Sequence, residues 1–436
     1  MTTAMNRREA IGAMSWPVAA LAAAATLSAF TPARTDAAEK IAAAGPDADD
    51  ECFWAMVAGA FTVDRSIMNL NNGGVSPSPR AVQEAMRRHL EFANSMPPPV
   101  ALWQIQEKQR EGVRQELARS FGADPEEIAI TRNASEGLQI CQFGFDLSRG
   151  DEVLCTNQDY PRMINTFKQR EKREGVVLKE FALPIPCEDP AEVVRRFEAG
   201  ITPRTKLILM SHMVNLTGQV LPVRAVAEMA RKHGIPVIVD GAHAFAHIPF
   251  KLSELGCDYY ATSLHKWLFA PHGTGLLYVR RDKIKDLWPL MAAPPERAEN
   301  IRKFEEIGTH PEANTLAISE AVTFHNLIGA ERKAARMVKL RKYWMDRLTG
   351  ANPDRVRIHT PSTTGLAFGV GNFEPLGVDP EKLQAHLWDA HRILVTTIKH
   401  EDFKGIRVTP SIYTTFVELD RFCDAVEAVL KNGLPA

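Results

Sequence analysis

VIVDGAHAFAHIPF (Val237–Phe250) and LGCDYYATSLHKWLFAPHGTGLLYVR (Leu255–Arg280) are the two stretches that decide the fold. The first opens with an apolar Val-Ile-Val run that ends in Asp240. The second contains a strand-like run, Tyr259–Ser263, that ends shortly before Lys266. Continuous apolar strands are typical of a parallel sheet with helices on both faces. Ligands bind outside the carboxyl ends of such strands, so the sequence places Asp240 and Lys266 at the functional edge.

The same alternation of short apolar runs and helix-like stretches extends outward on both sides. Further strands are predicted at Ile128–Thr131, Glu152–Thr156, Lys206–Ser211 and Gly275–Val279. Helical patterns lie between them, near residues 135–145, 162–174, 191–199 and 223–233. Strands that alternate with helices indicate crossover connections and a mostly parallel sheet. We therefore predict an α/β protein whose large domain spans residues 61–311.

After residue 311 the pattern changes. A long helix-like stretch covers Leu316–Arg347, and short strands are predicted at Leu366–Val370 and Ile406–Val408. This mixture predicts a smaller, C-terminal α+β domain over residues 312–436.

The N-terminus has the pattern of an export signal. Arg7 and Arg8 form a twin-arginine pair, and no charge occurs from Ala10 to Ala33. We read residues 1–38 as a twin-arginine signal peptide, so that the export machinery is a partner and the periplasm is the expected location. The alternative is an uncleaved membrane anchor, because the uncharged run is long enough to span a bilayer. Residues 39–60 are predicted to be a linker or N-terminal arm.

Composition excludes some classes of function. The 436 residues carry a formal net charge of −1, so no basic excess points to nucleic acid. None of the six cysteines forms a CxxC pair, and no Cys/His cluster has zinc spacing, so we predict no metal site. Disulfides stay an open alternative for an exported chain.

Asp240 and Lys266 form the strongest candidate pair. A carboxylate at the end of a buried strand needs a cationic partner, such as a protonated pyridine nitrogen, unless it only caps nearby amides. A lysine at a strand end between His265 and Trp267 is partly desolvated, which lowers the pKa of the amine and makes it a nucleophile or base. The alternative is an ordinary surface charge. Two such residues at the ends of two different strands favour a site.

Two further strand ends carry candidate residues. The predicted helix beginning at Ala134 and Ser135 offers free amides and a positive dipole end, which suits a phosphate group. An ordinary helix cap explains these residues equally well. Tyr160 follows the strand Glu152–Thr156, where its ring is available to lie on a planar cofactor or to pack in the core.

Together these residues resemble the class V aminotransferase family of fold-type-I pyridoxal-phosphate (PLP) enzymes over roughly residues 65–425. The specific motifs are an Asp-x-x-His element and the following Ser-x-His-Lys. The resemblance implies that Lys266 carries PLP as a Schiff base and that Asp240 pairs with its pyridinium nitrogen. It also implies the remaining cofactor contacts: His243 by the ring hydroxyl, Ser263, His265, Ala134 and Ser135 on the phosphate, and Tyr160 on the ring face.

The resemblance extends to the substrate side and to a second subunit. Asn215, in SHMVNLTGQVLP, matches an asparagine near the substrate and the ring. Arg407, in GIRVTPSIYTT, matches an arginine that clamps a substrate carboxylate, and Asn72 lies in a matching substrate-side loop. Thr309 matches a segment that reaches the phosphate of the neighbouring subunit, so the resemblance implies a homodimer.

The predicted activity is PLP chemistry at Cα of an amino acid. The resemblance favours transamination or epimerisation and is greatest for the isopenicillin-N-epimerase-like branch. A β-lyase or desulfurase-like reaction is the alternative, although the only cysteine after Cys257 is Cys423, and the Arg407 segment has none. Two other classes of protein agree less well with the sequence. A nucleotide-binding oxidoreductase lacks its GxGxxG motif, and an exported binding protein without catalysis does not need both Asp240 and Lys266.

Overall fold

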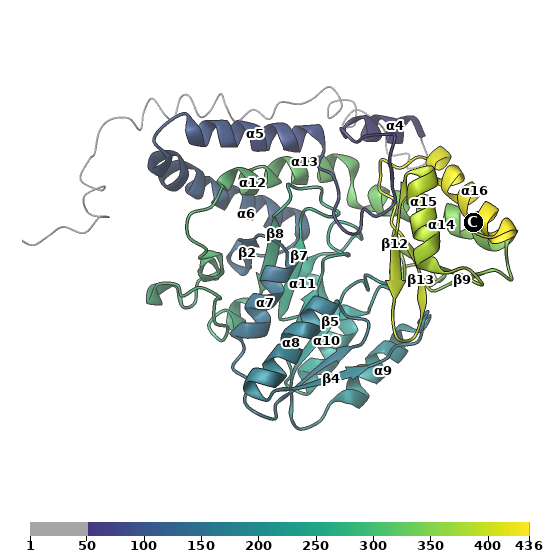
Figure 1. Cartoon of the computed structure of the whole chain (residues 1–436). Helices are drawn as coiled ribbons and strands as arrows, with labels where there is room; N and C mark the ends of the chain where they lie inside the picture. Colours follow the sequence, from purple (N-terminus) through teal and green to yellow (C-terminus); the bar gives the residue numbers. More distant parts are fainter. Residues whose placement is uncertain (1–50, 436) are drawn as a thin grey trace, which may run out of the picture.

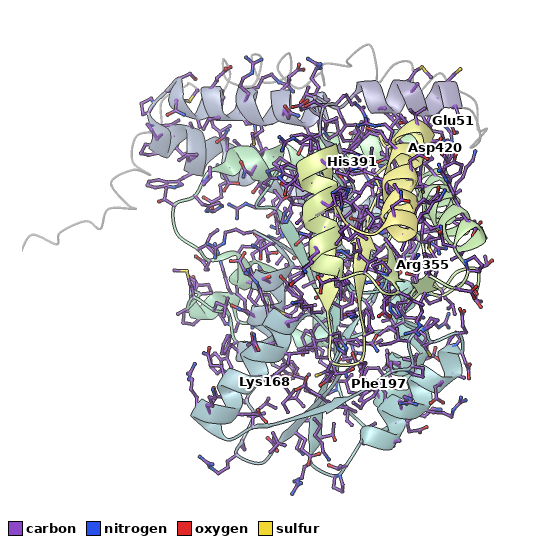
Figure 2. All side chains as sticks on the ribbon, turned by 45° about the vertical axis from the view of Figure 1, so that its right-hand side comes forward. Glu51, Lys168, Phe197, Arg355, His391 and Asp420 are labelled. Atoms are coloured by element: carbon purple, nitrogen blue, oxygen red, sulfur yellow. The ribbon has the colours of Figure 1, made fainter. Side chains whose placement is uncertain are left out.

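The computed structural model describes residues 51–435, so the predicted signal peptide and the start of the predicted linker lie outside the described residues. Its large domain is built around one twisted sheet between two layers of helices (Figure 1). In Figure 2, Lys168 and Phe197 mark the lower part of the large domain, and His391 and Asp420 mark helices of the small domain. Within residues 51–435, no helix is both long enough and apolar enough to cross a bilayer.

The central sheet has seven strands in the order β2-β8-β7-β6-β5-β3-β4. The strands are β2 (Ile128–Thr131), β3 (Glu152–Thr156), β4 (Val177–Phe181), β5 (Thr205–Ser211), β6 (Val237–Asp240), β7 (Tyr259–Ser263) and β8 (Gly275–Val279). The five strands from β7 to β4 are parallel, and β8 runs antiparallel to both of its neighbours. The predicted α/β class with a mostly parallel sheet is therefore confirmed.

Both faces of this sheet are buried, which explains the continuous apolar strands. In β5, Leu207 and Leu209 pack into one hydrophobic cluster, and the alternate residues Ile208 and Met210 pack into the other. The first cluster contains side chains of α7 (Ala134–Gly144) and α8 (Pro161–Glu174). The second contains side chains of α5 (Arg80–Asn94), α6 (Glu107–Phe121), α9 (Pro190–Gly200), α10 (Val223–Lys232), α11 (Leu252–Leu255) and α13 (Ile318–Ile328).

The small domain has its own sheet, in the order β12-β13-β10-β9. Its elements are α14 (Ala330–Ala351), β9 (Val356–Ile358), β10 (Gly371–Pro375), α15 (Pro380–His391), β11 (Ile393–Leu394), β12 (Thr396–Lys399), β13 (Lys404–Val408) and α16 (Phe416–Asn432). A short parallel pair between β1 (Met68–Asn69) and β11 joins the N-terminal segment to this domain. Asn71 to Gly74 are thereby held beside the C-terminal end of β13.

The predicted strand at Leu366–Val370 was wrong, because this apolar run is a buried loop that precedes β10. Backbone groups of this loop form hydrogen bonds with side chains of other elements instead of with a neighbouring strand. Arg341 donates hydrogen bonds to the carbonyls of Ala367 and Phe368, and His247 Nε2 accepts one from the Gly369 amide.

The predicted continuous helix over Leu316–Arg347 is divided into α12 (Glu312–Leu316), α13 and α14. Gly329 separates α13 from α14 with a φ of 88°, which a non-glycine residue rarely adopts. Leu316 and Ile318 pack into the large-domain cluster together with side chains of α5 and α6. We therefore propose that the domain boundary lies at Gly329 rather than after residue 311.

The end of the predicted linker is a helix, α4 (Glu51–Gly59). Its Phe53 and Trp54 are buried in a cluster that also contains Trp267 and Phe269. The N-terminal helix therefore packs directly behind the segment that carries Lys266. Four short helical turns and one π-helix complete the described chain: η1 (Pro99–Gln106), η2 (Pro125–Glu127), η3 (Arg281–Lys283), η4 (Pro295–Arg297) and η5 (Ile301–Glu305).

Candidate active site

A cavity of about 280 Å³ opens at the carboxyl ends of the central strands. Apart from Asn72 and Thr309, every predicted site residue lines it: Ala134, Ser135, Tyr160, Asn215, Asp240, His243, Ser263, His265, Lys266 and Arg407. Asp240 and Ser263 are the last residues of β6 and β7, and Tyr160 directly precedes α8. The sheet topology thus brings residues far apart in the sequence to one site, while their individual roles stay predictions.

The Lys266 amine is the candidate nucleophile. Its Nζ lies 3.2 Å from Nε2 of His243. Burial lowers the pKa of Lys266 to about 8, and the positive charge of Arg407 adds to this effect, whereas the negative charge of Asp240 opposes it. An appreciable fraction of the amine is therefore neutral near pH 7, as nucleophilic and general-base chemistry requires.

Asp240 and His243 are both buried beside this amine. Burial raises the pKa of Asp240, although the Ala242 amide donates to its Oδ1 at 3.0 Å and Lys266 supplies positive charge. Burial lowers the pKa of His243 well below its usual value, so that its imidazole is neutral. The site therefore contains a carboxyl group, a neutral imidazole and an amine at close quarters.

The N-terminus of α7 forms the opposite wall. The Asn133 side chain caps the helix by accepting a hydrogen bond from the Glu136 amide, and the Ala134 amide donates to Ser263 Oγ at 2.9 Å. A Cβ on Gly275 would lie 2.6 Å from the Asn133 backbone, so glycine is required for β8 to approach this helix end. A helix N-terminus with nearby hydroxyl groups is suited to bind a phosphate.

Arg407 projects into the cavity from β13. Its Nη1 donates to the Asn215 carbonyl at 3.0 Å and its Nη2 to Asn71 Oδ1 at 2.9 Å. Burial lowers the pKa of Arg407 to about 10, which leaves the guanidinium charged at neutral pH. Asn71, which holds one arm of this guanidinium, belongs to the substrate-side loop that the resemblance indicated, although Asn72 was the residue of that loop predicted to bind substrate. The contact of Asn71 depends on the β1–β11 pairing, which the local sequence pattern does not reveal.

Asp159 is a residue that the sequence analysis missed. Its carboxylate accepts hydrogen bonds from the amide and hydroxyl of Thr156 and from the amide and hydroxyl of Ser211, at 2.6–2.9 Å. Burial raises the pKa of Asp159 to about 6, and the charge of nearby Asp240 acts in the same direction. Asp159 therefore ties the ends of β3 and β5 together next to Tyr160.

Asn72, predicted to bind substrate, lies behind the cavity wall. Its amide donates to the carbonyls of Asn69 and Thr409, and its Oδ1 accepts from Tyr413. These bonds hold the loop in which Gly73 and Gly74 line the cavity. Asn72 is fully buried by them, and this is why its side chain does not reach the site.

Thr309 lies on a different cavity of about 410 Å³, together with Trp103, Arg110 and His310. The prediction gave Thr309 a role at the neighbouring subunit's phosphate, and the single chain places it outside its own cavity.

None of the six cysteines lines the cavity. Cys423, the only one in the C-terminal part, is buried within α16, where its Sγ contacts the Trp344 carbonyl. Burial raises the pKa of the Cys423 thiol to about 12, which suppresses the nucleophilic thiolate.

Unpaired polar atoms in the cavity wall fit a pyridoxal phosphate. Within residues 51–435, the buried atoms Asn215 Oδ1, His243 Nδ1 and Arg407 Nε have no protein hydrogen-bond partner. Buried polar groups are normally paired, so these atoms point to a polar ligand in the cavity. The arrangement matches a small ring with polar substituents, a phosphate and an aldehyde, since Lys266, Asp240 and the α7 terminus lie around the same space.

Comparisons with known proteins agree with this fit. The aminotransferase class-V family model matches residues 68–422. Isopenicillin N epimerase of Streptomyces clavuligerus is 31% identical over 401 residues, which are 86% of this chain and 98% of that protein. A probable cysteine desulfurase of Mycolicibacterium paratuberculosis is 27% identical over 74% of this chain and 49% of that protein.

A solved structure has the same fold. A mutant of C-DES with glycine covalently linked to its PLP cofactor has a TM-score of 0.75 at 24% identity, covering 84% of this chain and 98% of that one. The fold, the cavity and the family match agree, and the chain belongs to the class-V aminotransferase family of PLP-dependent enzymes.

Proposed function

We propose that this enzyme moves the Cα proton of an α-amino acid, with epimerisation as the first candidate for the net reaction and transamination as the second. One observation carries the proposal. An amine with a pKa of about 8, on Lys266, lies 3.2 Å from the neutral imidazole of His243 in a cavity that also contains Arg407. The isopenicillin N epimerase relative, which matches over nearly its whole length, favours epimerisation.

Each residue has a defined task in this proposal. Arg407 binds the substrate carboxylate, for which a planar guanidinium offers two parallel hydrogen bonds. Lys266 in its neutral form accepts the proton from Cα. Epimerisation would then require that a proton be returned to the opposite face of Cα, because return to the same face restores the original configuration. His243 stays neutral beside it and accepts a hydrogen from the Lys266 amine. Asn71 and Asn215 hold the Arg407 side chain in a fixed direction.

The protein holds the cofactor through the same cavity. In this proposal Asp240 pairs with the ring nitrogen, Tyr160 lies against the ring, and Ser263 binds the phosphate together with the α7 N-terminus. Their presence in the lining of one cavity supports these roles. When bound, PLP supplies an electron sink that stabilises the negative charge left at Cα. Burial of Asp240 strengthens its interaction with a cation, because the surroundings are poor in water.

The position of the cysteines argues against a desulfurase reaction that uses a protein thiol. Cys423 is buried in α16 and Cys257 is buried after α11, and neither lines the cavity. A β-elimination that needs no thiol starts with the same proton removal and is an outcome of the following test.

The test is incubation of the PLP-loaded enzyme with a panel of L- and D-amino acids in deuterated water. Chiral chromatography and mass spectrometry then identify the products. Deuterium at Cα with inverted configuration supports epimerisation, and a keto acid supports transamination. Pyruvate with a released side-chain fragment, or no exchange with any member of the panel, contradicts the proposal. Lys266→Ala should abolish exchange, and Lys172→Ala, an exposed lysine of α8, is the matched control.

We further propose that the enzyme is a homodimer in which Thr309 of one subunit serves the site of the other. The position of Thr309 outside its own cavity supports this. The test mixes two inactive variants, Lys266→Ala and Thr309→Arg, after reversible dissociation. Recovered activity is expected if sites are shared, and a mixture that stays inactive contradicts the proposal.

We also propose export through the twin-arginine route to the periplasm, supported by Arg7, Arg8 and the uncharged run that follows. Fractionation of cells that express the full chain tests this. Arg7→Lys with Arg8→Lys should retain the protein in the cytoplasm. Equal export of the variant would contradict the proposal, and an exported chain of full mass would indicate a membrane anchor.

A further inference from the structure

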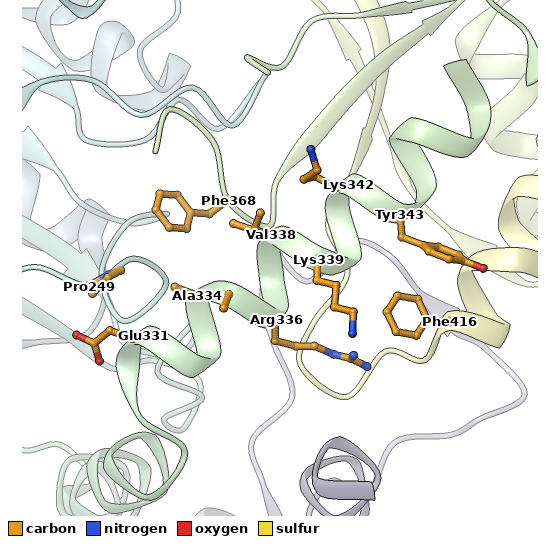
Figure 3. Close-up of a pocket in the computed structure, with 11 residues that line it drawn as sticks. Pro249, Glu331, Ala334, Arg336, Val338, Lys339, Lys342, Tyr343, Phe368 and Phe416 are labelled. Atoms are coloured by element: carbon orange, nitrogen blue, oxygen red, sulfur yellow. The ribbon is translucent and has the colours of Figure 1, made fainter. Parts of the chain in front are cut away.

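A long, mainly apolar groove runs along α14 and shares no lining residue with the active-site cavity. It has a volume of about 1060 Å³ and follows α14 from Glu331 to Tyr343 (Figure 3). Its apolar lining includes Val338, Phe368 and Phe416. This is larger than most small-molecule pockets, which measure roughly 300–1,000 Å³, and its elongated shape suits a stretch of polypeptide.

The described chain begins at the rim of this groove. Glu51, the first residue of α4, forms an ion pair with Arg336 (Oε1 to Nη1, 2.6 Å) and a longer one with Lys339 (3.8 Å). The Arg336 guanidinium also lies over the ring of Phe416, and Figure 3 shows Arg336 and Lys339 extending toward that ring. Arg336 and Lys339 both line the groove, so the chain before Glu51 starts next to it.

The segment before Glu51 and the α14 groove are complementary in charge and composition. The residues immediately before Glu51 include three acids, Asp47, Asp49 and Asp50, and farther back lies the small apolar run Ile41–Ala44. Besides Arg336 and Lys339, which pair with Glu51, the groove is lined by a third cation, the exposed Lys342. Within residues 51–435, no ion pair to Lys342 is present. Glu331 also lines the groove, but Arg336, Lys339 and Lys342 outnumber it. An acidic segment with a short apolar run therefore matches a groove with an apolar floor and a net basic rim.

The segment is also long enough. Twelve positions separate residues 331 and 343 on α14, which correspond to about 18 Å at 1.5 Å per residue. An extended chain covers this distance with about five or six residues at roughly 3.3 Å each. Residues 39–50 provide twice that number.

We propose that residues 39–50 bind in the α14 groove of their own chain, as a strap that continues α4. Asp47, Asp49 and Asp50 face the cations of α14, and Ile41–Ala44 covers apolar floor. A tethered segment has an effective concentration on the order of millimolar, which favours it over a second copy of the chain. The strap fastens α4, whose Phe53 and Trp54 pack with Trp267 behind Lys266. This inference does not depend on which reaction the enzyme catalyses.

The test places a photo-crosslinking benzoyl-phenylalanine at position 338 of the full chain. Intact mass first verifies that residues 39–50 are present in the purified protein. After illumination, peptide mapping should find residue 338 joined to the 39–50 segment. The same probe at Lys172, an exposed position on α8, is the control and should not capture this segment. A mixture of ¹⁵N-labelled and unlabelled chains separates a crosslink within one chain from one between two chains.

A crosslink from residue 338 to a second chain or to another protein, or none to residues 39–50, overturns the proposal. Charge variants provide a second measurement. Asp47→Asn, Asp49→Asn and Asp50→Asn together should lower the crosslinked fraction severalfold, and so should Lys342→Glu. A matched triple variant of exposed acids elsewhere, Asp286→Asn, Glu296→Gln and Glu299→Gln, should leave it unchanged. Equal yields in the two triple variants would contradict the proposed charge pairing.

Discussion

Nζ of Lys266 lies 3.2 Å from Nε2 of His243, and both side chains are enclosed at the carboxyl end of the sheet. Burial lowers the pKa of both groups, so that the pair carries less positive charge near neutral pH than a solvated lysine and histidine would. Asp240 is buried at the end of the adjacent strand and opposes the shift of Lys266. The lowered pKa makes the Lys266 amine reactive. The position of Asp240 at the end of the adjacent strand places a carboxyl group close to that amine.

The lowered pKa of Lys266 predicts how the apoprotein takes up PLP. Only the neutral amine attacks an aldehyde, so the rate of PLP attachment should rise with pH and level off above about 8. Asp240 raises the pKa of Lys266, so Asp240→Asn should move the midpoint to lower pH. Stopped-flow absorbance measures both profiles. A midpoint near that of an ordinary lysine, or one that Asp240→Asn leaves in place, would contradict this assignment.

Asp159 predicts a pH dependence of stability. Burial raises the pKa of its carboxyl group from 3.8 to about 6 in the folded protein, so the folded state binds this proton more tightly than the unfolded state. The resulting stabilisation is full below about pH 4 and is lost as the pH rises through about 6, with a size of roughly 3 kcal/mol for such a shift. Asp159→Asn removes this contribution. Denaturant unfolding at several pH values should show the free-energy difference between wild type and variant shrinking from pH 4 to pH 6.5. A constant difference would refute the raised pKa.

Arg407 predicts a substrate-binding defect that charge alone does not repair. Arg407→Lys keeps the positive charge and loses the planar fork that Asn71 and Asn215 hold. We expect kcat/KM for the preferred amino acid to fall by at least about tenfold, which corresponds to about 1.4 kcal/mol. Arg355→Lys, at an exposed position of the small domain, is the control and should leave kcat/KM unchanged. Wild-type kinetics in Arg407→Lys would exclude the carboxylate clamp.

Cys423 predicts a negative result that separates two reaction types. Its thiol is buried in α16 and its pKa is raised to about 12, so it is unsuited to act as a sulfur acceptor. Cys423→Ala should leave kcat within about twofold, while the cavity lowers the free energy of unfolding by about 1 kcal/mol. Loss of turnover in a variant that is still folded would instead support a thiol-dependent reaction.

The parts of the fold that were predictable are those with a local cause. β6 and β7 are covered on both faces, so their sequences are continuous apolar runs. These runs made it possible to predict that Asp240 and Lys266 lie at or just beyond strand ends. β4 was missed because it lies at the sheet edge, where its residues are only partly buried and its composition is mixed. The loop Leu366–Val370 has strand composition, but its backbone is bound by Arg341 and His247 from distant elements.

The residues of the candidate site also fall into two groups, those with a local signal in the sequence and those without one. Residues at strand ends were found because the parallel sheet places them at one edge. The contact of Asn71 with Arg407 and the part played by Asp159 were not predicted, because both come from pairing between distant segments. Asn71 reaches Arg407 through the β1–β11 pair, and Asp159 reaches Ser211 from the end of the adjacent strand. Asn72 was predicted to bind substrate instead of its neighbour Asn71. The direction in which each side chain of a loop points depends on the hydrogen bonds of the loop, and the sequence does not show these.

The central claim is that Lys266 holds the cofactor, and one measurement tests it most directly. The PLP-loaded enzyme is reduced with borohydride, digested and mapped by mass spectrometry. The account predicts that the pyridoxyl mass is found on the peptide that contains Lys266 and on that side chain. A tag on another lysine, or no tag on protein whose PLP content has been verified, would contradict it.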